Sequence, residues 1–286
     1  MIEEDYYGWS SAVLANEKLE IRYLTDAGPR VVGFGPAGGP NLLARTPDVS
    51  WDVSGRRFHL MGGHRFWYAP EVTGRSDWPD TEGLKAEETP TGVRLIQQPD
   101  PYGISKELVL ELVANEPHVR VTHVLRNESD SPTEIAPWSI TQMALGGTAL
   151  LPQATMPTEG MPLFPNRGIV IWPYSKWNDQ RIVWGDPLIR VEGLPGDPPL
   201  KIGYFNPHGW LGYQLDGWVF VKRWIPSPGA KHTDEGSNAE IYVNDVCLEL
   251  EALAPLEILE PDETVRHVET WEVFPVDAAE ERLRLD

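Results

Sequence analysis

Cysteine, basic side chains and long apolar runs are all scarce in this sequence of 286 residues. Cys247 is the only cysteine, so the chain cannot form an internal disulfide, which fits a reducing compartment. No apolar run approaches the length that spans a bilayer, and the acidic first residues lack the basic and apolar parts of a signal peptide. We therefore expect a cytoplasmic protein with no membrane partner.

The excess of acidic over basic side chains excludes further classes of partner. Lys and Arg number 24 and Asp and Glu number 43, which gives a formal net charge of −19. Because an acidic surface repels phosphate backbones, we expect no nucleic-acid partner. Neutral or cationic small molecules remain open.

Helical stripes are scarce as well, whereas turn residues are abundant, with 27 Pro and 26 Gly. Apolar residues recur at every second position, for example over 19–24, 108–112 and 119–125, which is the period of a half-buried strand. Short strands separated by many turns predict an all-β protein, a large antiparallel β-sandwich. We expect one sandwich domain over 1–275, with the Pro-rich stretch 152–165 as a loop across one face. Residues 276–286 form a charged C-terminal tail, with a short helix as one alternative.

Several strings, taken in order, resemble the galactose-mutarotase-like (aldose 1-epimerase) superfamily, in particular a bacterial branch of it. They cover nearly the whole chain: 19–33 with 40–43, 62–71, 121–129, 136–138 and 247–271. The resemblance implies the superfamily's supersandwich fold, with a sugar-sized cleft on one face. It also implies a small-molecule carbohydrate as partner and no cofactor. The 12 Trp residues fit an aromatic-lined cleft, although most single Trp residues pack in cores.

The chemistry implied by the resemblance is the interconversion of sugar anomers. A carboxylate takes the proton of the anomeric hydroxyl, and a His protonates the ring oxygen. Glu249 falls at the superfamily's base, but Trp138 stands where its acid His is expected. His64 is the candidate replacement for that acid, with Arg65 orienting a sugar hydroxyl.

The residues around these positions suggest further contacts. Glu249 and Glu251 alternate with leucines, so both face one side of a strand, either a solvated face or the lining of a cleft. Trp67 and Glu71 follow Arg65 closely and give the mixture of aromatic and charged groups that sugar recognition uses. The predicted substrate-binding set is therefore Arg65, Trp67, Glu71, Trp138, Lys222 and Glu251. No His or Cys spacing matches a zinc pattern, so we expect no metal.

Three functions remain open from the sequence. The first is aldose 1-epimerase-type proton transfer, with Glu249 as the base and His64 as the acid. The second is a non-catalytic carbohydrate-binding module that kept the cleft and lost the acid His. The third is a sugar lyase or hydrolase that uses the same cleft with different groups.

Overall fold

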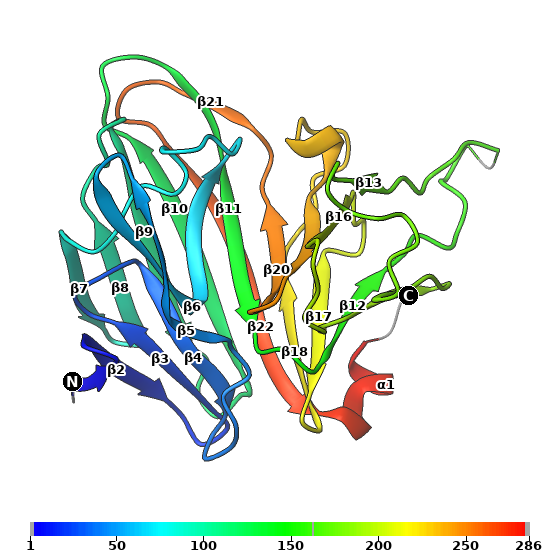
Figure 1. Ribbon diagram of the computed structural model, residues 1–286, viewed down its shortest axis with the longest axis horizontal. Coiled ribbons are helices and arrows are strands. Elements are labelled where there is room, and N and C mark those ends of the chain that lie inside the picture. Colours follow the sequence, from blue (N-terminus) through cyan, green and yellow to red (C-terminus); the bar gives the residue numbers. More distant parts are fainter. Residues whose placement is uncertain (1–2, 162, 284–286) are drawn as a thin grey trace.

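The computed structural model describes residues 3–161 and 163–283, and it consists of two large antiparallel sheets (Figure 1). In hydrogen-bonded order, the first sheet contains β1 (Glu3–Tyr6), β2 (Trp9–Ala15), β3 (Leu19–Leu24), β4 (Arg30–Pro36), β6 (Arg56–Ala69), β11 (Thr133–Met143), β20 (Leu248–Leu253), β19 (Ala239–Val243), β16 (Leu200–Tyr204) and β13 (Val170–Ile171). In addition, β5 (Arg45–Val53) pairs with β6, and β21 (Glu257–Leu259) pairs with β11.

The second sheet contains, in the same order, β14 (Ile182–Val183), β15 (Leu188–Glu192), β12 (Thr148–Pro152), β17 (Trp210–Leu215), β18 (Trp218–Arg223), β22 (Thr264–Pro275), β10 (His118–Asn127), β9 (Ile104–Leu112), β8 (Gly92–Gln97) and β7 (Leu84–Thr89). The all-β sandwich expected from the sequence is therefore confirmed.

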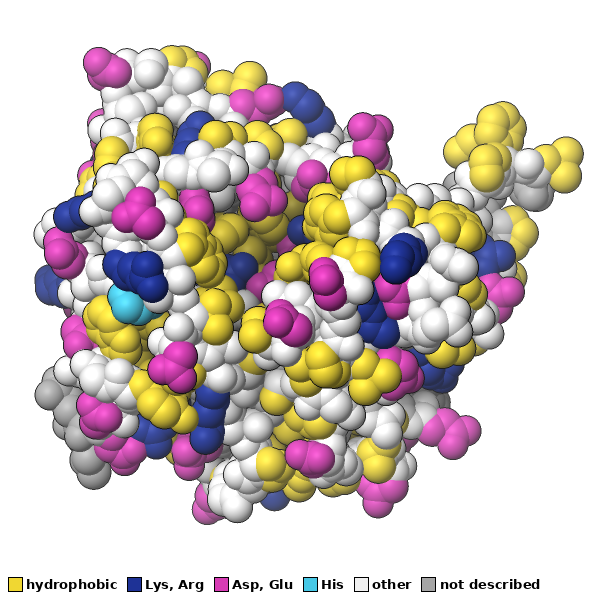
Figure 2. Space-filling model, viewed as in Figure 1, with side chains coloured by type: hydrophobic (Ala, Val, Ile, Leu, Met, Phe, Trp, Pro, Cys, Tyr) yellow, Lys and Arg dark blue, Asp and Glu magenta, His cyan; other side chains and the backbone are white. Residues whose placement is uncertain are grey.

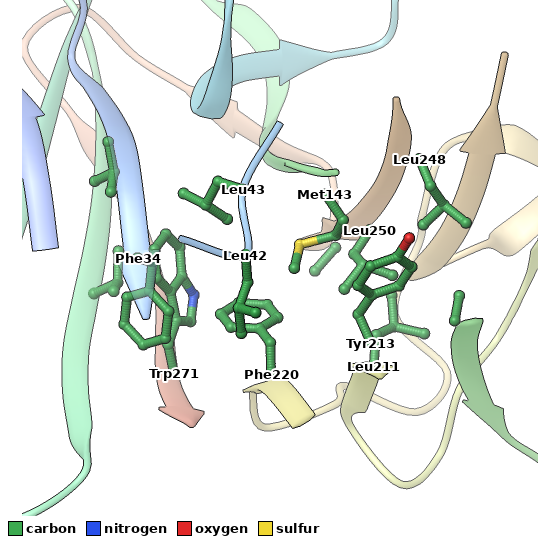
Figure 3. Packing of buried hydrophobic residues seen from close by; sticks show 14 of the residues in the cluster. Phe34, Leu42, Leu43, Met143, Leu211, Tyr213, Phe220, Leu248, Leu250 and Trp271 are labelled. Carbon is green, nitrogen blue, oxygen red and sulfur yellow. The ribbon is translucent and has the colours of Figure 1, made fainter. Parts of the chain in front are cut away.

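The space between the sheets is filled by alternate residues of the strands. Phe34 from the first sheet meets Phe220 and Trp271 from the second in edge-to-face contacts, with ring centroids 5.3 and 5.7 Å apart. Figure 3 shows these rings packed beside Leu42 and Leu250. Burial of apolar side chains in this layer is the main force that holds the two sheets together.

Helix is confined to short pieces. These are η1 (Asp234–Gly236), η2 (Val276–Ala278) and α1 (Ala279–Arg282), so the predicted tail does begin with helix, while its residues 284–286 lie outside the described part. Over 3–161 and 163–283, no helix is both long and apolar enough to cross a membrane. The segment that follows β12 projects away from the sheets (Figure 1), so it does not lie across a sandwich face as expected.

Two consecutive glycines bend the long strand β6 where it passes its neighbours. Gly62 and Gly63 have φ of +84° and +71°. A Cβ at Gly63 would lie 2.0 Å from the carbonyl oxygen of Val31, and one at Gly62 would lie 2.2 Å from that of Ala44. The pair therefore lets neighbouring backbone approach β6, rather than a ligand.

This bend yields a test of stability. Gly63→Ala places a non-glycine residue at positive φ, which should destabilise the fold by about 1–2 kcal/mol. The clash of its Cβ with neighbouring backbone should destabilise the fold by about 1–3 kcal/mol more. Gly55→Ala is the matched control, because Gly55 has φ +78° but open space around its Cβ position. Denaturant unfolding should show a clearly larger loss for Gly63→Ala, and equal losses would contradict the close-approach explanation.

Candidate functional site

The outer face of the first sheet carries a cavity of about 670 Å³, within the size range of small-molecule sites. Figure 2 shows a hollow in the middle of the viewed face, where hydrophobic, basic and acidic side chains meet. Aromatic side chains supply much of the wall: Trp51, Trp67, Trp138, Trp172, Tyr174 and Tyr242. The cavity can therefore accept a ring-shaped, partly apolar ligand.

Strand register brings the polar groups together. On β20, Glu249 lies opposite Gln142 of β11 on one side and Tyr242 of β19 on the other. Arg65 of β6 lies opposite Ile140, one step along the same face of β11. Because side chains alternate along a strand, all these residues point to the cavity side of the sheet.

Glu249 is the best-held carboxylate of the cavity. Its Oε1 accepts hydrogen bonds from Arg65 Nη2 at 3.0 Å and from Gln142 Nε2 at 2.7 Å. The Arg65 guanidinium is itself fixed over Trp67, with its Cζ 4.4 Å from the ring centroid. Burial raises the pKa of the Glu249 carboxyl, and Arg65 opposes that shift. Glu249 is thus a desolvated carboxyl group paired with one cation, and a raised pKa makes its carboxylate a stronger proton acceptor.

Glu71 is the second carboxylate at the cavity. It follows the end of β6 at the solvent-exposed rim, and none of the described residues pairs with its carboxyl group. Enclosure of that group raises its pKa, with Lys201 and Arg65 opposing the shift. A carboxyl with a raised pKa holds its proton more readily, which suits a proton donor.

A buried cluster of charges supports the floor. Lys201 Nζ lies 2.7 Å from Glu240 Oε2 and 3.0 Å from Glu251 Oε2. Trp138 Nε1 also donates to Glu251 Oε2, at 2.8 Å. Although burial lowers the pKa of Lys201, Glu251 and Glu240 raise it, and the resulting pKa lies well above the usual value for lysine. Lys201 is therefore a fixed cation under the aromatic wall.

His64 lies on the opposite side of the sheet from the cavity. It is fully buried between the sheets, where Nδ1 lies 3.0 Å from Thr141 Oγ1 and Nε2 lies 2.9 Å from His123 Nε2. Burial lowers its pKa well below the usual value. Its neighbour Arg65 takes the cavity side, because adjacent residues of β6 face opposite ways. His64 cannot reach a ligand from this position, so we do not propose it as the acid.

Lys222 also lies in the interior. Its Nζ contacts Ser139 Oγ at 2.5 Å and Glu269 Oε1 at 3.2 Å, and the side chain is fully buried. Its strand, β18, belongs to the second sheet, so the ammonium group points between the sheets rather than at the cavity. The predicted substrate contact of Lys222 is therefore replaced by a structural ion pair.

The remaining predicted residues divide into two groups. Glu249, Arg65, Trp67, Glu71 and Trp138 all line the cavity. Glu251 is fully buried and supports the floor, one layer below.

Sequence reasoning missed Lys201, Gln142 and Tyr242 as lining residues. Gln142 is four residues after Trp138, the spacing of one strand face, and this was a usable signal. Lys201 and Tyr242 gave no such signal, because their strands are short and irregularly spaced. Among the described residues, no group of three or more His, Cys, Asp or Glu side chains could hold a metal ion.

Comparison with known proteins identifies the fold rather than the activity. No family model matches the sequence, and no curated protein matches it. Solved structures do match. A galactose mutarotase-like protein from Lactobacillus casei superposes with a TM-score of 0.57 at 8% identity, covering 92% of this chain and 100% of its own. A proposed aldose 1-epimerase from Escherichia coli K12 gives 0.56 at 14% identity, covering 94% and 100%.

A third match is longer than this chain. A TPR-domain containing protein from Parabacteroides distasonis gives a TM-score of 0.64 at 14% identity. The match covers 94% of this chain and 48% of that protein, so this chain spans about half of its length. The two-sheet antiparallel sandwich described above is therefore of the galactose-mutarotase-like kind.

The Arg65–Glu249 pair makes a prediction about stability and pH. Arg65→Met leaves the Glu249 carboxylate buried without its cation. This should lower the free energy of unfolding by about 3–5 kcal/mol. The pKa of Glu249 then rises further, so its folded form prefers the protonated state. The penalty should accordingly be small at about pH 5 and grow as pH rises through the folded pKa, to a maximum by about pH 8.

Denaturant unfolding at both pH values provides the measurement, and the double variant Arg65→Met with Glu249→Gln provides the control. Because that variant carries no buried carboxylate at this position, its stability should not fall with rising pH in the same way. A penalty for Arg65→Met that is equal at both pH values would contradict the pairing.

Proposed function

We propose that this protein is carbohydrate-active and catalyses aldose 1-epimerase-type proton transfer on a sugar. The observation that carries the proposal is a pair of carboxyl groups, Glu249 and Glu71, at one aromatic-lined cavity of sugar size. Glu249 is paired with Arg65, while Glu71 has no partner among the described residues, and desolvation raises the pKa of both.

In the proposed reaction, Glu249 takes the proton of the anomeric hydroxyl. Glu71 gives a proton to the ring oxygen as the bond from that oxygen to the anomeric carbon breaks. The open-chain aldehyde then rotates and recloses on its other face, which returns both protons. The neutral apolar face of a sugar ring would lie against the tryptophan walls, and Gln142 would hold Glu249 in position.

One observation favours a competing function. Trp138 occupies the position expected for the acid His, and no histidine lines the cavity within the described residues. A carbohydrate-binding module that has lost catalysis would look the same at this position. The two functions differ in whether Glu71 and Glu249 transfer protons, which substitution can decide.

Glu249→Gln should reduce the acceleration of anomer equilibration by about 10²–10⁴-fold while sugar binding persists, because the amide keeps the shape but cannot accept a proton. Glu71→Gln should reduce the rate and remove the alkaline limb of the pH–rate profile. That limb arises where a proton donor with a raised pKa loses its proton. NMR exchange spectroscopy or polarimetry on fresh glucose and galactose provides the rates.

The exposed Glu257→Gln on β21 is the matched control and should equilibrate sugars at the wild-type rate. If the wild-type protein binds a sugar but leaves its equilibration at the spontaneous rate, the binding module is the correct function. If Glu71→Gln keeps full activity and the alkaline limb, Glu71 is not the acid.

The charges of the cavity also predict which sugars fit. Both cations at the cavity are already paired, Arg65 with Glu249 and Lys201 with two buried glutamates, whereas Glu71 and Asp245 have no ion-pair partner over 3–161 and 163–283. Above the pH at which Glu71 loses its proton, glucose 6-phosphate should therefore bind the cavity at least about tenfold more weakly than glucose, roughly 1.4 kcal/mol. Direct binding of each sugar, followed by NMR titration at that pH, tests this, and Glu71→Gln should narrow the difference. Equal binding would contradict the charge argument.

A further inference from the structure

A second cavity, of about 520 Å³, shares no lining residue with the first. It lies where the start of β2, the first residues of β6 and the segment 78–83 meet the end of β8 and the start of β9. These strands belong to the blue-to-cyan half of Figure 1. Two indole rings, Trp9 and Trp78, supply aromatic surface at its wall. Nothing in the proposed sugar chemistry uses this cavity.

Lys106 is the unusual residue of the second cavity. On β9 it occupies an inward-facing position between Ile104 and Leu108, and only 6% of it is exposed. Among the described residues, its ammonium group has neither a hydrogen-bond acceptor nor an ion-pair partner. Its Nζ lies 5.7 Å from the ring centroid of Tyr68.

An unpaired lysine at such a position destabilises the folded protein, because burial removes water from a charge without replacing it. Burial accordingly lowers the pKa of Lys106, which nearby Asp80 and Asp100 only partly offset. A methionine or leucine would fill the same space without this cost. A lysine at this destabilising position is explained if a bound ligand supplies the missing negative charge.

The carboxylates of this cavity are already engaged elsewhere. Asp80 receives two hydrogen bonds from Arg30, each 3.0 Å long. Asp100 accepts the Tyr68 hydroxyl at 2.5 Å through Oδ2, and two backbone N–H groups through Oδ1. The third carboxylate, Glu82, is exposed and lies 3.5 Å from Arg56. All three are thus held by partners other than Lys106, and the two aspartates only partly offset the burial of its ammonium group.

Two further cationic groups lie at the same cavity, Arg56, which pairs with Glu82, and Arg57. Arg57 donates to Ser50 Oγ at 2.9 Å, and no described carboxylate pairs with it. Its neighbour His59 packs against Trp9, with ring centroids 5.7 Å apart. Arg57 and Lys106 are thus cations of this cavity that have no carboxylate partner among the described residues, although the whole chain carries a net charge of −19.

We propose that the second cavity binds a small molecule that carries a carboxylate or phosphate group, with Lys106 receiving that group and Trp9 and Trp78 contacting the rest of the molecule. Binding supplies the charge that the buried ammonium lacks. The proposal is independent of the sugar cavity and of any activity there.

Thermal unfolding with simple anions tests the proposal. At equal ionic strength, inorganic phosphate or acetate should raise the Tm of the wild-type protein above its value in chloride, and neutral glycerol should not. Comparing the two anions tells which group the site prefers. Lys106→Met should raise the Tm in chloride, because it removes an unpaired buried charge, and should abolish the response to the anion.

Lys18→Met is the matched control, since Lys18 is exposed, and it should leave both Tm values and the response unchanged. A wild-type protein that responds to neither anion, or a Lys106→Met variant that responds fully, would overturn the proposal. Should that variant not fold, ¹³C-methylation of the lysines in the wild-type protein reports the same interaction. The Lys106 signal is assigned by its loss in Lys106→Arg, which separates it from the buried Lys222. Its titration should move to higher pH in phosphate, and an unmoved titration would also overturn the proposal.

Discussion

In neighbouring strands of the first sheet, side chains alternate between the two faces, and this alternation decides which polar groups reach the cavity and which lie between the sheets. His64 and Arg65 on β6, and Thr141 and Gln142 on β11, are adjacent in sequence and face opposite sides of one sheet. One side is the dry interior between the sheets, and the other is the cavity. A shift of one residue in register would exchange the two sets and destroy both. The kink at Gly62 and Gly63 fixes that register where β6 passes its neighbours.

The sheet consequently separates two buried charge clusters that differ in how completely they are satisfied. On the interior side, Glu269 receives Ser139 Oγ, Trp271 Nε1 and the Lys222 ammonium. On the cavity side, Glu251 Oε1 and Gln142 Oε1 are buried without a partner among the described residues. A buried polar atom without a partner costs about 1–3 kcal/mol, so a purely structural network would be expected to complete these bonds. The incomplete cluster is the one that faces the cavity.

These differences explain what the sequence could predict. Alternation and turn residues were enough for the strands and the sandwich, because both depend on local patterns. Glu249, Arg65, Trp67, Glu71 and Trp138 were found as candidates because their strings resemble a known superfamily. His64 and Lys222 were assigned to the wrong side of the fold, because composition does not tell which face of a strand is inward when polar residues occupy both. Lys201 depends on strands paired over long sequence distances, which no local pattern reveals.

The two cavities also differ in the sign of the charged groups that have no ion-pair partner among the described residues. At the first, every cation is paired with a carboxylate, and the groups left over are the acids Glu71 and Asp245. At the second, the acids are held by Arg30, Arg56, Tyr68 and backbone, and the cations without a carboxylate partner among the described residues are Lys106 and Arg57. Paired charges contribute little to recognition, because their fields largely cancel, so the unpaired group determines what a cavity attracts. By this argument, the first proposed site favours a neutral or cationic ligand and the second proposed site favours an anionic one.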